Sequence, residues 1–464
     1  MTEAPALSRG GPTATRAPVR AAAITNLGCK VNQAEMEAAA RLFRARGIAL
    51  VDDGRTADLH LVNTCTVTSI ADRKSRQAVR RARRANPDAR VVVTGCSVRI
   101  DPASVAAADP AAHLVDDPDR DLLAELASLL GPSVDDGARG PLDGALPTLS
   151  GVEPVAAAGR AIDGVSDDRA GVERTRAFVK VQDGCSFFCT YCIIPRARGP
   201  ERSLSPDAVV GEVRRAVAAG HREVVLTGIN VGTYDGGASE RGARGSHLRA
   251  ALTLAGLVRR ILAETEVERI RLSSIEPQHV DDELLDAWAA APARCLPHFH
   301  LPLQSGDDGV LRRMGRRYDG AAYAAVVDRA RRAIPGLAVH ADVIAGFPTE
   351  DEEAHGRNLS IIRELGIVHG HVFPYSSRPG TPAARMPQAD AATVKARAAE
   401  LRAAVAEERR RWLESTVGTP QRVLAERDGT GHAENFARFR LPSSATPGSI
   451  LTVTPTHIVE GLLA

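Results

Sequence analysis

Long apolar runs are missing from this sequence. Nothing in its 464 residues approaches the about 18–20 uninterrupted apolar residues that a membrane helix requires. The first twenty residues, MTEAPALSRGGPTATRAPVR, also lack the apolar core of a signal peptide. We therefore expect residues 1–20 to form a disordered leader, and we expect a cytoplasmic protein that has no membrane partner.

An excess of either charge sign is missing as well, because the formal net charge is only +2. Lysine is scarce, since only four of the 59 basic residues are lysines. A nearly balanced charge gives no argument for a nucleic-acid partner. Composition alone therefore leaves the partner open.

Cysteine is scarce too, yet three of the seven cysteines fall in the stretch GCSFFCTYC, which ends at Cys192. Cytoplasmic thiols stay reduced and usually serve metals or catalysis. A structural zinc site needs a fourth Cys or His at short spacing, and none follows Cys185, Cys189 and Cys192. A [4Fe–4S] cube takes one ligand per iron, so three thiolates leave one iron for a substrate or cofactor.

The other cysteines suggest a second site. Strand-like runs at 21–29, 57–65 and 89–96 end in Cys29, Cys65 and Cys96, and helical patterns lie between them. This alternation predicts a small parallel sheet over 21–130, whose strand ends meet at one crevice. The three thiols would then form a second three-thiolate site, although free cysteines also serve as small buried hydrophobes. We expect the remaining one, Cys295, to be a core thiol.

The rest of the chain predicts two further domains. Residues 131–175 are rich in Gly, Pro, Asp and Ser and indicate a linker. Residues 176–402 alternate strand and helix patterns, which predicts an α/β fold with a partial (β/α)6 barrel. An exposed loop is expected at 234–247. Residues 403–464 predict a connecting helix and a small β-barrel. The six expected barrel strands lie at 177–184, 223–230, 269–276, 298–306, 338–348 and 367–376.

The C-x3-C-x2-C spacing at the start of such a barrel resembles the radical S-adenosylmethionine (radical SAM) superfamily. The resemblance implies that SAM chelates the open iron of the cluster on Cys185, Cys189 and Cys192 and is cleaved to a 5′-deoxyadenosyl radical. It also implies SAM contacts at five positions, although strand termini with turn residues would show the same pattern. These expected contacts are Tyr191, Thr227, Gly228, Asn230 and Ser273.

The stretches LGCKVNQAEME and VNTCTVTSIADRKSRQ resemble the amino-terminal domain of the methylthiotransferases, the MiaB, RimO and MtaB group. The tail resembles a TRAM domain, a small β-barrel that binds RNA. The resemblance implies insertion of a methylthio group at an unactivated C–H bond, with two [4Fe–4S] clusters. One SAM would methylate sulfur at an auxiliary cluster on Cys29, Cys65 and Cys96, and another would supply the radical. A sulfur source and an electron donor such as flavodoxin or ferredoxin are implied too.

Within this group, GCKVNQ is most similar to the MtaB branch, which acts on N6-threonylcarbamoyladenosine at position 37 of tRNA. This similarity implies an anticodon-loop partner and substrate-binding roles for Lys30, Asn32 and Gln33. The alternatives are isopentenyladenosine at position 37, an aspartate of a ribosomal protein, or a non-catalytic RNA-binding protein with a structural metal.

Independent signals for RNA are modest. The run RKSRQAVRRARR places seven cations on one predicted helix, which either grips phosphates or is a solvated surface. The tail has few aromatic residues besides Phe436 and Phe439, so base stacking there would be limited.

Overall fold

The computed structural model describes residues 18–115, 122–131, 175–238 and 252–464. Nearly all of the leader expected at 1–20 and of the linker expected at 131–175 therefore lies outside the described residues. So do residues 239–247 of the expected exposed loop.

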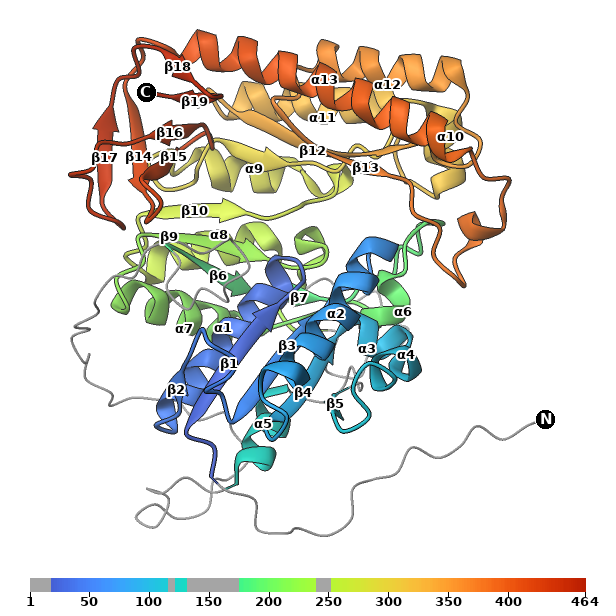
Figure 1. Ribbon diagram of the computed structural model, residues 1–464. Helices are drawn as coiled ribbons and strands as arrows, with labels where there is room; N and C mark the ends of the chain where they lie inside the picture. Colours follow the sequence, from blue (N-terminus) through green and yellow to red (C-terminus); the bar gives the residue numbers. More distant parts are fainter. Residues whose placement is uncertain (1–17, 116–121, 132–174, 239–251) are drawn as a thin grey trace.

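The amino-terminal domain is built on a five-stranded parallel sheet (Figure 1). Asn26, Asn63 and Thr94 are register partners across its three central strands, so the carboxyl ends of these strands lie level. In spatial order the strands are β2 (Ala49–Leu50), β1 (Ala21–Asn26), β3 (Leu59–Thr64), β4 (Arg90–Gly95) and β5 (His113–Leu114).

Helices cover both faces of this sheet, because successive side chains along its strands point to opposite faces and both sets are buried. Leu59 and Leu61 pack with Phe43 of α1 (Lys30–Ala45) and Leu126 of α5 (Leu122–Leu130). On the other face Val62, Val91 and Val93 pack against three further helices. These are α2 (Ser69–Ala85), α3 (Cys96–Ile100) and α4 (Pro102–Ala106).

The central domain contains six parallel strands, as the sequence predicts, and the α/β fold class is confirmed. Two three-stranded sheets, β10-β9-β6 and β11-β12-β13, are joined by the parallel bridges Ile270–Cys295 and Ser274–His300. The strands are β6 (Arg176–Lys180), β9 (Glu223–Thr227), β10 (Arg269–Leu272), β11 (His298–His300), β12 (Ala338–Ala345) and β13 (His369–Pro374). Among the described residues β6 and β13 do not pair, so the barrel is open on one side.

Helices surround the outside of this barrel, and Cys295 lies buried in its core. The helices are α6 (Ile194–Arg198), α7 (Pro206–Ala218), α8 (Leu254–Glu264), α9 (Asp282–Ala289), α10 (Asp308–Met314), α11 (Gly320–Ala333), α12 (Glu352–Glu364) and α13 (Ala391–Thr416). Shorter elements are β7 (Gln182–Asp183), β8 (Arg202–Ser203), and the 3-10 helices at Val231–Thr233, Pro277–His279 and Pro382–Arg385.

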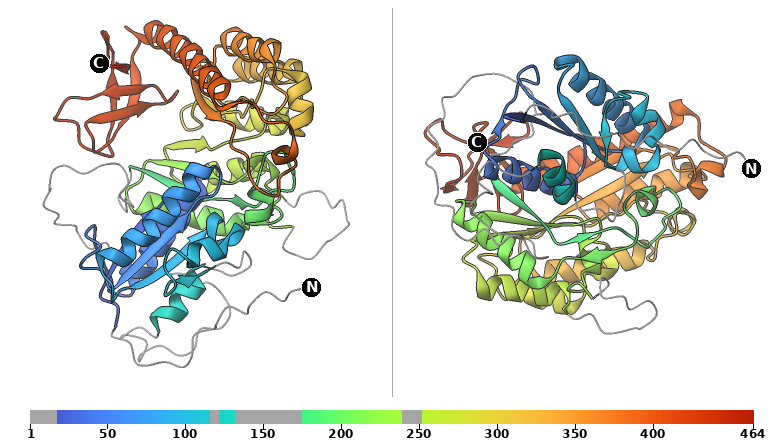
Figure 2. Two further views of the ribbon diagram at one scale, coloured as in Figure 1. Left: turned by 45° about the vertical axis from the view of Figure 1, so that its right-hand side comes forward. Right: turned by 90° about the horizontal axis from the view of Figure 1, so that it is seen from below.

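The helix α13 leads to a carboxyl-terminal domain at one end of the molecule (Figures 1 and 2). This domain is a six-stranded sheet. Its strands in spatial order are β17 (Ile450–Val453), β14 (Gln421–Ala425), β15 (Thr430–Ala433), β16 (Arg438–Arg440), β19 (Leu462–Leu463) and β18 (Ile458–Val459).

The carboxyl-terminal domain docks where the barrel strands begin. Arg271 donates to the carbonyls of Ala433 at 2.7 Å and Glu434 at 2.8 Å, and the Phe436 ring stacks on His298 with centroids 4.7 Å apart. Phe439 is fully buried in the domain core. Both aromatic residues that the sequence offers for base stacking are therefore used inside the protein.

The amino-terminal domain lies beside β6 at the open side of the barrel, with α1 against that strand (Figure 1). No helix among the described residues combines the length and the apolarity needed to cross a membrane.

Candidate active site

The first three-cysteine set lies where β1, β3 and β4 end. Cys29 caps α1, Cys65 follows β3, and Cys96 is the first residue of α3. Burial, together with the nearby Cys96 and Cys29, raises the pKa of the Cys65 thiol to about 11. The level strand ends therefore bring the three thiols together, as expected from a parallel sheet.

Small polar residues fix the loop that carries Cys65. Ser75 accepts from the Cys65 backbone N–H at 3.1 Å, and Ser97 donates to the Cys65 carbonyl at 2.7 Å. Gly95 has a φ of +96°, and a Cβ there would lie 2.3 Å from the Oδ1 of Asn63. Glycine is therefore needed directly before Cys96.

The second set, Cys185, Cys189 and Cys192, lies on the loop that follows β7. Gly184 starts this loop with a φ of +72°, and a Cβ there would lie 1.9 Å from the Pro200 carbonyl oxygen, so the position requires glycine. The Cys192 N–H donates to the Cys189 carbonyl at 2.9 Å. Burial raises the pKa of Cys192 to about 12, and Cys189 and Cys185 also raise it.

Neither set has the geometry of a single-ion site. Four thiolates about 2.3 Å from a zinc ion lie within about 4 Å of one another. Within the described residues, only His300, Asp342 and His371 form a group whose ligand atoms all lie within 4.8 Å of one another. Two wider sets of three thiols are what a multi-iron cluster requires, with one thiolate for each of three irons.

A buried arginine lies against the second set. Arg316 donates to the Cys189 sulfur and to the Tyr191 hydroxyl, both at 3.4 Å, and forms an ion pair with Glu276. Sequence reasoning missed Arg316 and Glu276, although Glu276 is the last residue of the strand expected at 269–276.

Three of the expected SAM contacts carry buried polar atoms that have no hydrogen-bond partner in the described part of the chain. They are the hydroxyls of Thr227 and Ser273 and both amide atoms of Asn230. Buried polar groups are rarely left unpaired, so such atoms indicate a polar ligand. Residues of this kind, beside a three-thiol set, fit SAM bound to a cluster.

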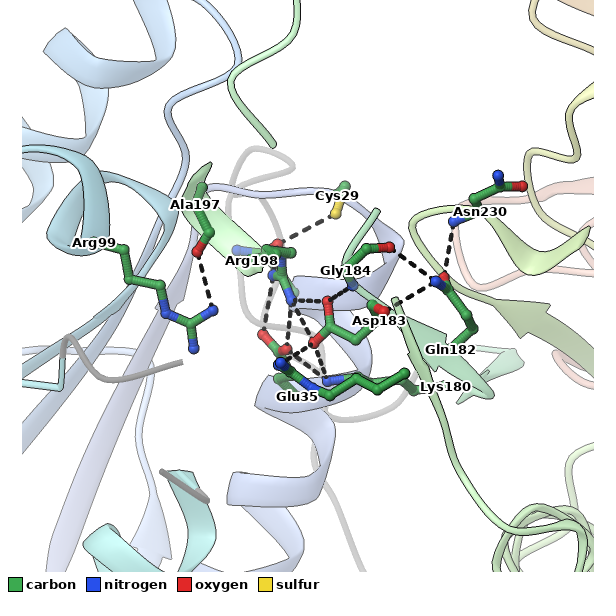
Figure 3. Close-up of polar contacts among 12 residues, drawn as sticks. Cys29, Glu35, Arg99, Lys180, Gln182, Asp183, Gly184, Ala197, Arg198 and Asn230 are labelled. Carbon is green, nitrogen blue, oxygen red and sulfur yellow. Dashed lines mark hydrogen bonds and ion pairs between the residues drawn. The ribbon is translucent and has the colours of Figure 1, made fainter. Parts of the chain in front are cut away.

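Gly228 and Tyr191 are the other two residues predicted to contact SAM, and their surroundings differ from those of the first three. Gly228 lies against Gln182, whose Oε1 would be 2.9 Å from a Cβ at that position. Gln182 in turn accepts from the Asn230 N–H at 2.9 Å and donates to the Gly184 carbonyl at 2.8 Å, which joins the strand end to the cysteine loop (Figure 3). The ring of Tyr191 meets Phe347 edge-on, and burial raises the pKa of its hydroxyl.

Arg198 lies between the helix that follows Cys29 and Asp183, which precedes the second cysteine loop (Figure 3). It is buried, and its Nη2 donates to the Asn32 Oδ1 at 2.7 Å, which also accepts from the Cys29 thiol at 3.2 Å. Its Nη1 lies 3.0 Å from Asp183, next to the second cysteine loop, and 2.9 Å from Glu35 of α1. One guanidinium therefore contacts both domains between the two sets.

The acidic partners of Arg198 are held ionised. Burial raises the pKa of the Glu35 carboxyl, but Arg198 and then Lys180 outweigh it and lower the pKa to about 2. Lys180 lies 3.1 Å from Glu35 and 2.7 Å from Asp183. The sequence contains these four residues without any local signal that they meet.

The three residues predicted to bind substrate have different surroundings in the structure. Asn32 is buried and donates to the Asn63 Oδ1 at 2.5 Å, and Gln33 accepts from Asn26 at 3.0 Å. Lys30 has no hydrogen bond or ion pair with another described residue and remains exposed to solvent. Desolvation by the surrounding protein, followed by the charge of Arg176, lowers the pKa of Lys30 to about 8.

Comparison with known proteins agrees with this architecture. Residues 21–116 match the family described as "Uncharacterized protein family UPF0004", and residues 179–357 match the radical SAM superfamily. The structure of the radical SAM methyltransferase TsrM from Kitasatospora setae with tryptophan and a SAM analogue has a TM-score of 0.52 at 18% identity. It covers 78% of this chain and 75% of that chain, so the two share a fold.

Sequence relatives are closer. The threonylcarbamoyladenosine tRNA methylthiotransferase MtaB of Bacillus subtilis is 39% identical over 364 residues, 78% of this chain and 75% of that protein. The MtaB of Rickettsia prowazekii is 33% identical over 95% of this chain and 96% of its own length. The tRNA-2-methylthio-N(6)-dimethylallyladenosine synthase of Sphingopyxis alaskensis is 33% identical over 88% of this chain and 86% of its own length. The chain therefore belongs to the MiaB, RimO and MtaB family of radical SAM methylthiotransferases.

Proposed function

We propose that this enzyme converts N6-threonylcarbamoyladenosine at position 37 of tRNA to its 2-methylthio derivative, using SAM and two [4Fe–4S] clusters. The observation that carries the proposal is the pair of three-cysteine sets on either side of Arg198. A second set beside the SAM site is unnecessary for methylation or rearrangement alone. The two MtaB relatives supply the choice of nucleoside.

The residues fit the proposed cofactors. Cys185, Cys189 and Cys192 would hold the cluster that binds SAM, and Cys29, Cys65 and Cys96 would hold the auxiliary cluster. Thr227, Asn230 and Ser273 would satisfy their unpaired polar atoms on SAM. When bound, these groups supply hydrogen abstraction and the transfer of methylated sulfur.

Residues of the chain position this chemistry. Arg316 donates a hydrogen bond to the Cys189 sulfur and would hold that ligand in place. Gln182 holds the Asn230 backbone against the Gly184 loop, so the SAM contact and the cysteine loop move together. Arg198 fixes the separation of the two cysteine sets by pairing with residues of both domains. Fixed separation matters because the substrate must be reached from both clusters.

An RNA partner is supported by α2, which lies directly after Cys65. Five of its cations are exposed and have no ion pair with any residue described here, so they remain available to phosphates. Arg83 is excluded from this set because it pairs with Asp109 at 3.0 Å. The five are Arg73, Lys74, Arg80, Arg81 and Arg84. We propose that they grip the anticodon arm and that the TRAM-like sheet contacts RNA through shape and phosphates.

The reaction implies further partners. An electron donor such as flavodoxin or ferredoxin would reduce the SAM-binding cluster, and a sulfur source would restore the auxiliary site after each turnover. We propose a cytoplasmic setting, where the six cluster thiols stay reduced before iron binds.

Nucleoside mass spectrometry of bulk tRNA from cells with and without the gene tests the proposal. We expect the 2-methylthio form to disappear and threonylcarbamoyladenosine to accumulate when the gene is deleted. An unchanged threonylcarbamoyladenosine profile contradicts the proposed substrate. Accumulation of isopentenyladenosine in the same data favours isopentenyladenosine as the substrate, the alternative that the Sphingopyxis alaskensis relative suggests. An unmodified ribosomal-protein aspartate in the cells without the gene favours the ribosomal-protein alternative.

A further inference from the structure

A histidine–aspartate–histidine group lies inside the barrel, and its three residues belong to neither cysteine set. Asp342 of β12 accepts through one oxygen from His300 Nε2 at 3.0 Å and from His371 Nδ1 at 3.1 Å. Ser274 Oγ lies 2.8 Å from His300 Nδ1 and fixes the other side of that ring. Asp342 and His371 are register partners on neighbouring strands, so the backbone itself holds the pair together.

This group opens toward the unpaired edge of the barrel. The side chain of His300 is 8% exposed, that of Asp342 is 20% exposed, and that of His371 on the edge strand β13 is 53% exposed. Asp342 binds His371 through Nδ1, so the His371 Nε2 is left for another partner. The second oxygen of Asp342 also has no hydrogen bond to any described residue.

Lys30 lies at the same opening. It begins α1, which packs against β6 on the opposite edge of the barrel. Arg176, Asp342 and Arg271 all act on its charge, and Lys30 in turn acts on His298 next to the group. Its ammonium is a cation without a hydrogen-bond or ion-pair partner among the described residues, and it lies close enough to Asp342 for the two charges to act on each other.

The charges around the opening favour an anion over a metal ion. Three ligand atoms within 4.8 Å of one another could in principle hold a divalent cation. Such an ion would add two positive charges near the unpaired Lys30, whereas Arg271 and Arg176 already have Glu223 and Glu426 as partners. A ligand that carries one negative charge together with hydrogen-bond donors would instead pair with Lys30 and satisfy the open acceptors.

We propose that Lys30, His371 and Asp342 form the pocket for the threonylcarbamoyl side chain of the substrate, with Lys30 binding its carboxylate. This inference rests on the proposed function. The side chain also carries a hydroxyl and N–H groups, which would donate to His371 Nε2 and to the second oxygen of Asp342. An isopentenyl group has neither charge nor donors and would leave Lys30 and both acceptors unpaired, which a polar site penalises strongly.

The test uses three anticodon stem-loops that differ only at position 37. One carries threonylcarbamoyladenosine, one carries its methyl ester, and one carries isopentenyladenosine. Binding to the anaerobically prepared, cluster-loaded enzyme is measured by fluorescence anisotropy. The wild type is expected to bind the acid about ten- to a hundredfold more tightly than the ester, because one charge-assisted contact is lost.

Two substitutions at Lys30 distinguish a loss of its positive charge from a disturbance of the fold. Lys30→Gln should remove the preference for acid over ester, whereas Lys30→Arg should keep most of it. Lys395→Gln, on the exposed surface of α13, is the matched control and should behave as the wild type. Iron per chain is measured in every preparation, because Lys30 is next to Cys29. His371→Ala tests the other side of the opening, and it should weaken binding of both the acid and the ester relative to isopentenyladenosine.

Several outcomes would overturn the pocket. One is a Lys30→Gln enzyme that still prefers the acid. Another is equal weakening of all three stem-loops, which would assign Lys30 to the RNA backbone. A third is stoichiometric zinc or iron, beyond the clusters, that His371→Ala removes. Conversion of the acid stem-loop by the wild type with SAM tests the proposed function separately: failure there, with the Lys30 pattern intact, would contradict the reaction and not the pocket.

Discussion

Arg198 donates a hydrogen bond of 2.7 Å to Asn32, and this contact joins the helix after Cys192 to the helix after Cys29. Asn32 accepts at the same oxygen from the Cys29 thiol. Asn32, which the family resemblance implies to bind substrate, therefore also contacts Cys29, a proposed cluster ligand. The distance between the two proposed clusters depends on a buried network of one arginine, one amide and two carboxylates.

Arg198→Gln is expected to lower the free energy of unfolding by about 3–5 kcal/mol, because Glu35 and Asp183 lose a buried cation. Iron bound at the first cysteine set should fall as well, which iron analysis and electron paramagnetic resonance would detect. Arg196→Gln, on the exposed side of the same helix, is the control and should leave both unchanged. Full iron content and wild-type stability in Arg198→Gln would refute the supporting role.

Substitutions of cysteine should separate the two sites. Cys189→Ala is expected to abolish both SAM cleavage and methylthio product, because the SAM-binding cluster loses a ligand. Cys65→Ala should keep some SAM cleavage while stopping product formation. Both are followed by mass spectrometry of 5′-deoxyadenosine and of the modified nucleoside. Cys295→Ala, in the barrel core, should keep both activities at a stability cost of about 1 kcal/mol.

The opposite result would reassign the first set. If Cys65→Ala formed product at the wild-type rate, Cys29, Cys65 and Cys96 would not hold the auxiliary cluster. If Cys295→Ala lost product, the core thiol would have a role that its burial does not suggest.

Asn230→Ala should weaken SAM binding without weakening the fold. Both amide atoms of Asn230 are buried without a protein partner, so their removal costs no hydrogen bond within the described residues. We expect an unchanged or higher melting temperature without SAM, and SAM binding weaker by about tenfold or more in calorimetry. A clearly lower melting temperature in the absence of SAM would instead make Asn230 a structural residue.

Acidification should loosen the docking of the carboxyl-terminal domain. Burial lowers the pKa of His298 and His340 well below the usual value, and it lowers that of His369 to about 4. The folded chain holds these rings neutral, whereas the unfolded chain takes up protons below about pH 6.5. The free energy of unfolding should therefore fall as the pH drops from about 6.5 toward 4, and should not depend on these groups above that range.

The measurement compares wild type with His369→Gln by denaturant unfolding between pH 7.5 and 5.5, where the difference between the two proteins cancels the contribution of the clusters. The variant should lose less stability on acidification. If the free energy of unfolding fell equally steeply with decreasing pH in the two proteins, the pKa of His369 would not be lowered by folding.

Much of the site follows from the sequence because it depends on periodicity and strand ends. The parallel strands that end before Cys29, Cys65 and Cys96 are visible as apolar runs, and parallel topology alone makes their ends converge. The same reasoning correctly places the six barrel strands. Local patterns are sufficient for these features because backbone hydrogen bonding decides them.

Contacts between side chains far apart in the chain could not be predicted in this way. Arg198 meets Glu35 and Asn32 across more than 160 residues, and nothing in the local sequence marks that partnership. Arg316 reaches Cys189 from a turn after α10 that no periodicity singles out. The docking of Phe436 on His298 depends on how two domains pack, which hydrophobic patterning within either domain does not specify.

The most direct test of the central claim is to incubate the anaerobically reconstituted enzyme with SAM, a reductant, sulfide and tRNA from cells that lack the gene, and then to analyse the nucleosides by mass spectrometry. The account predicts conversion of threonylcarbamoyladenosine to its 2-methylthio derivative by a protein that holds about eight irons per chain, four for each cube. SAM cleavage without any methylthio product, or product formed by a protein with only one cluster, would contradict it.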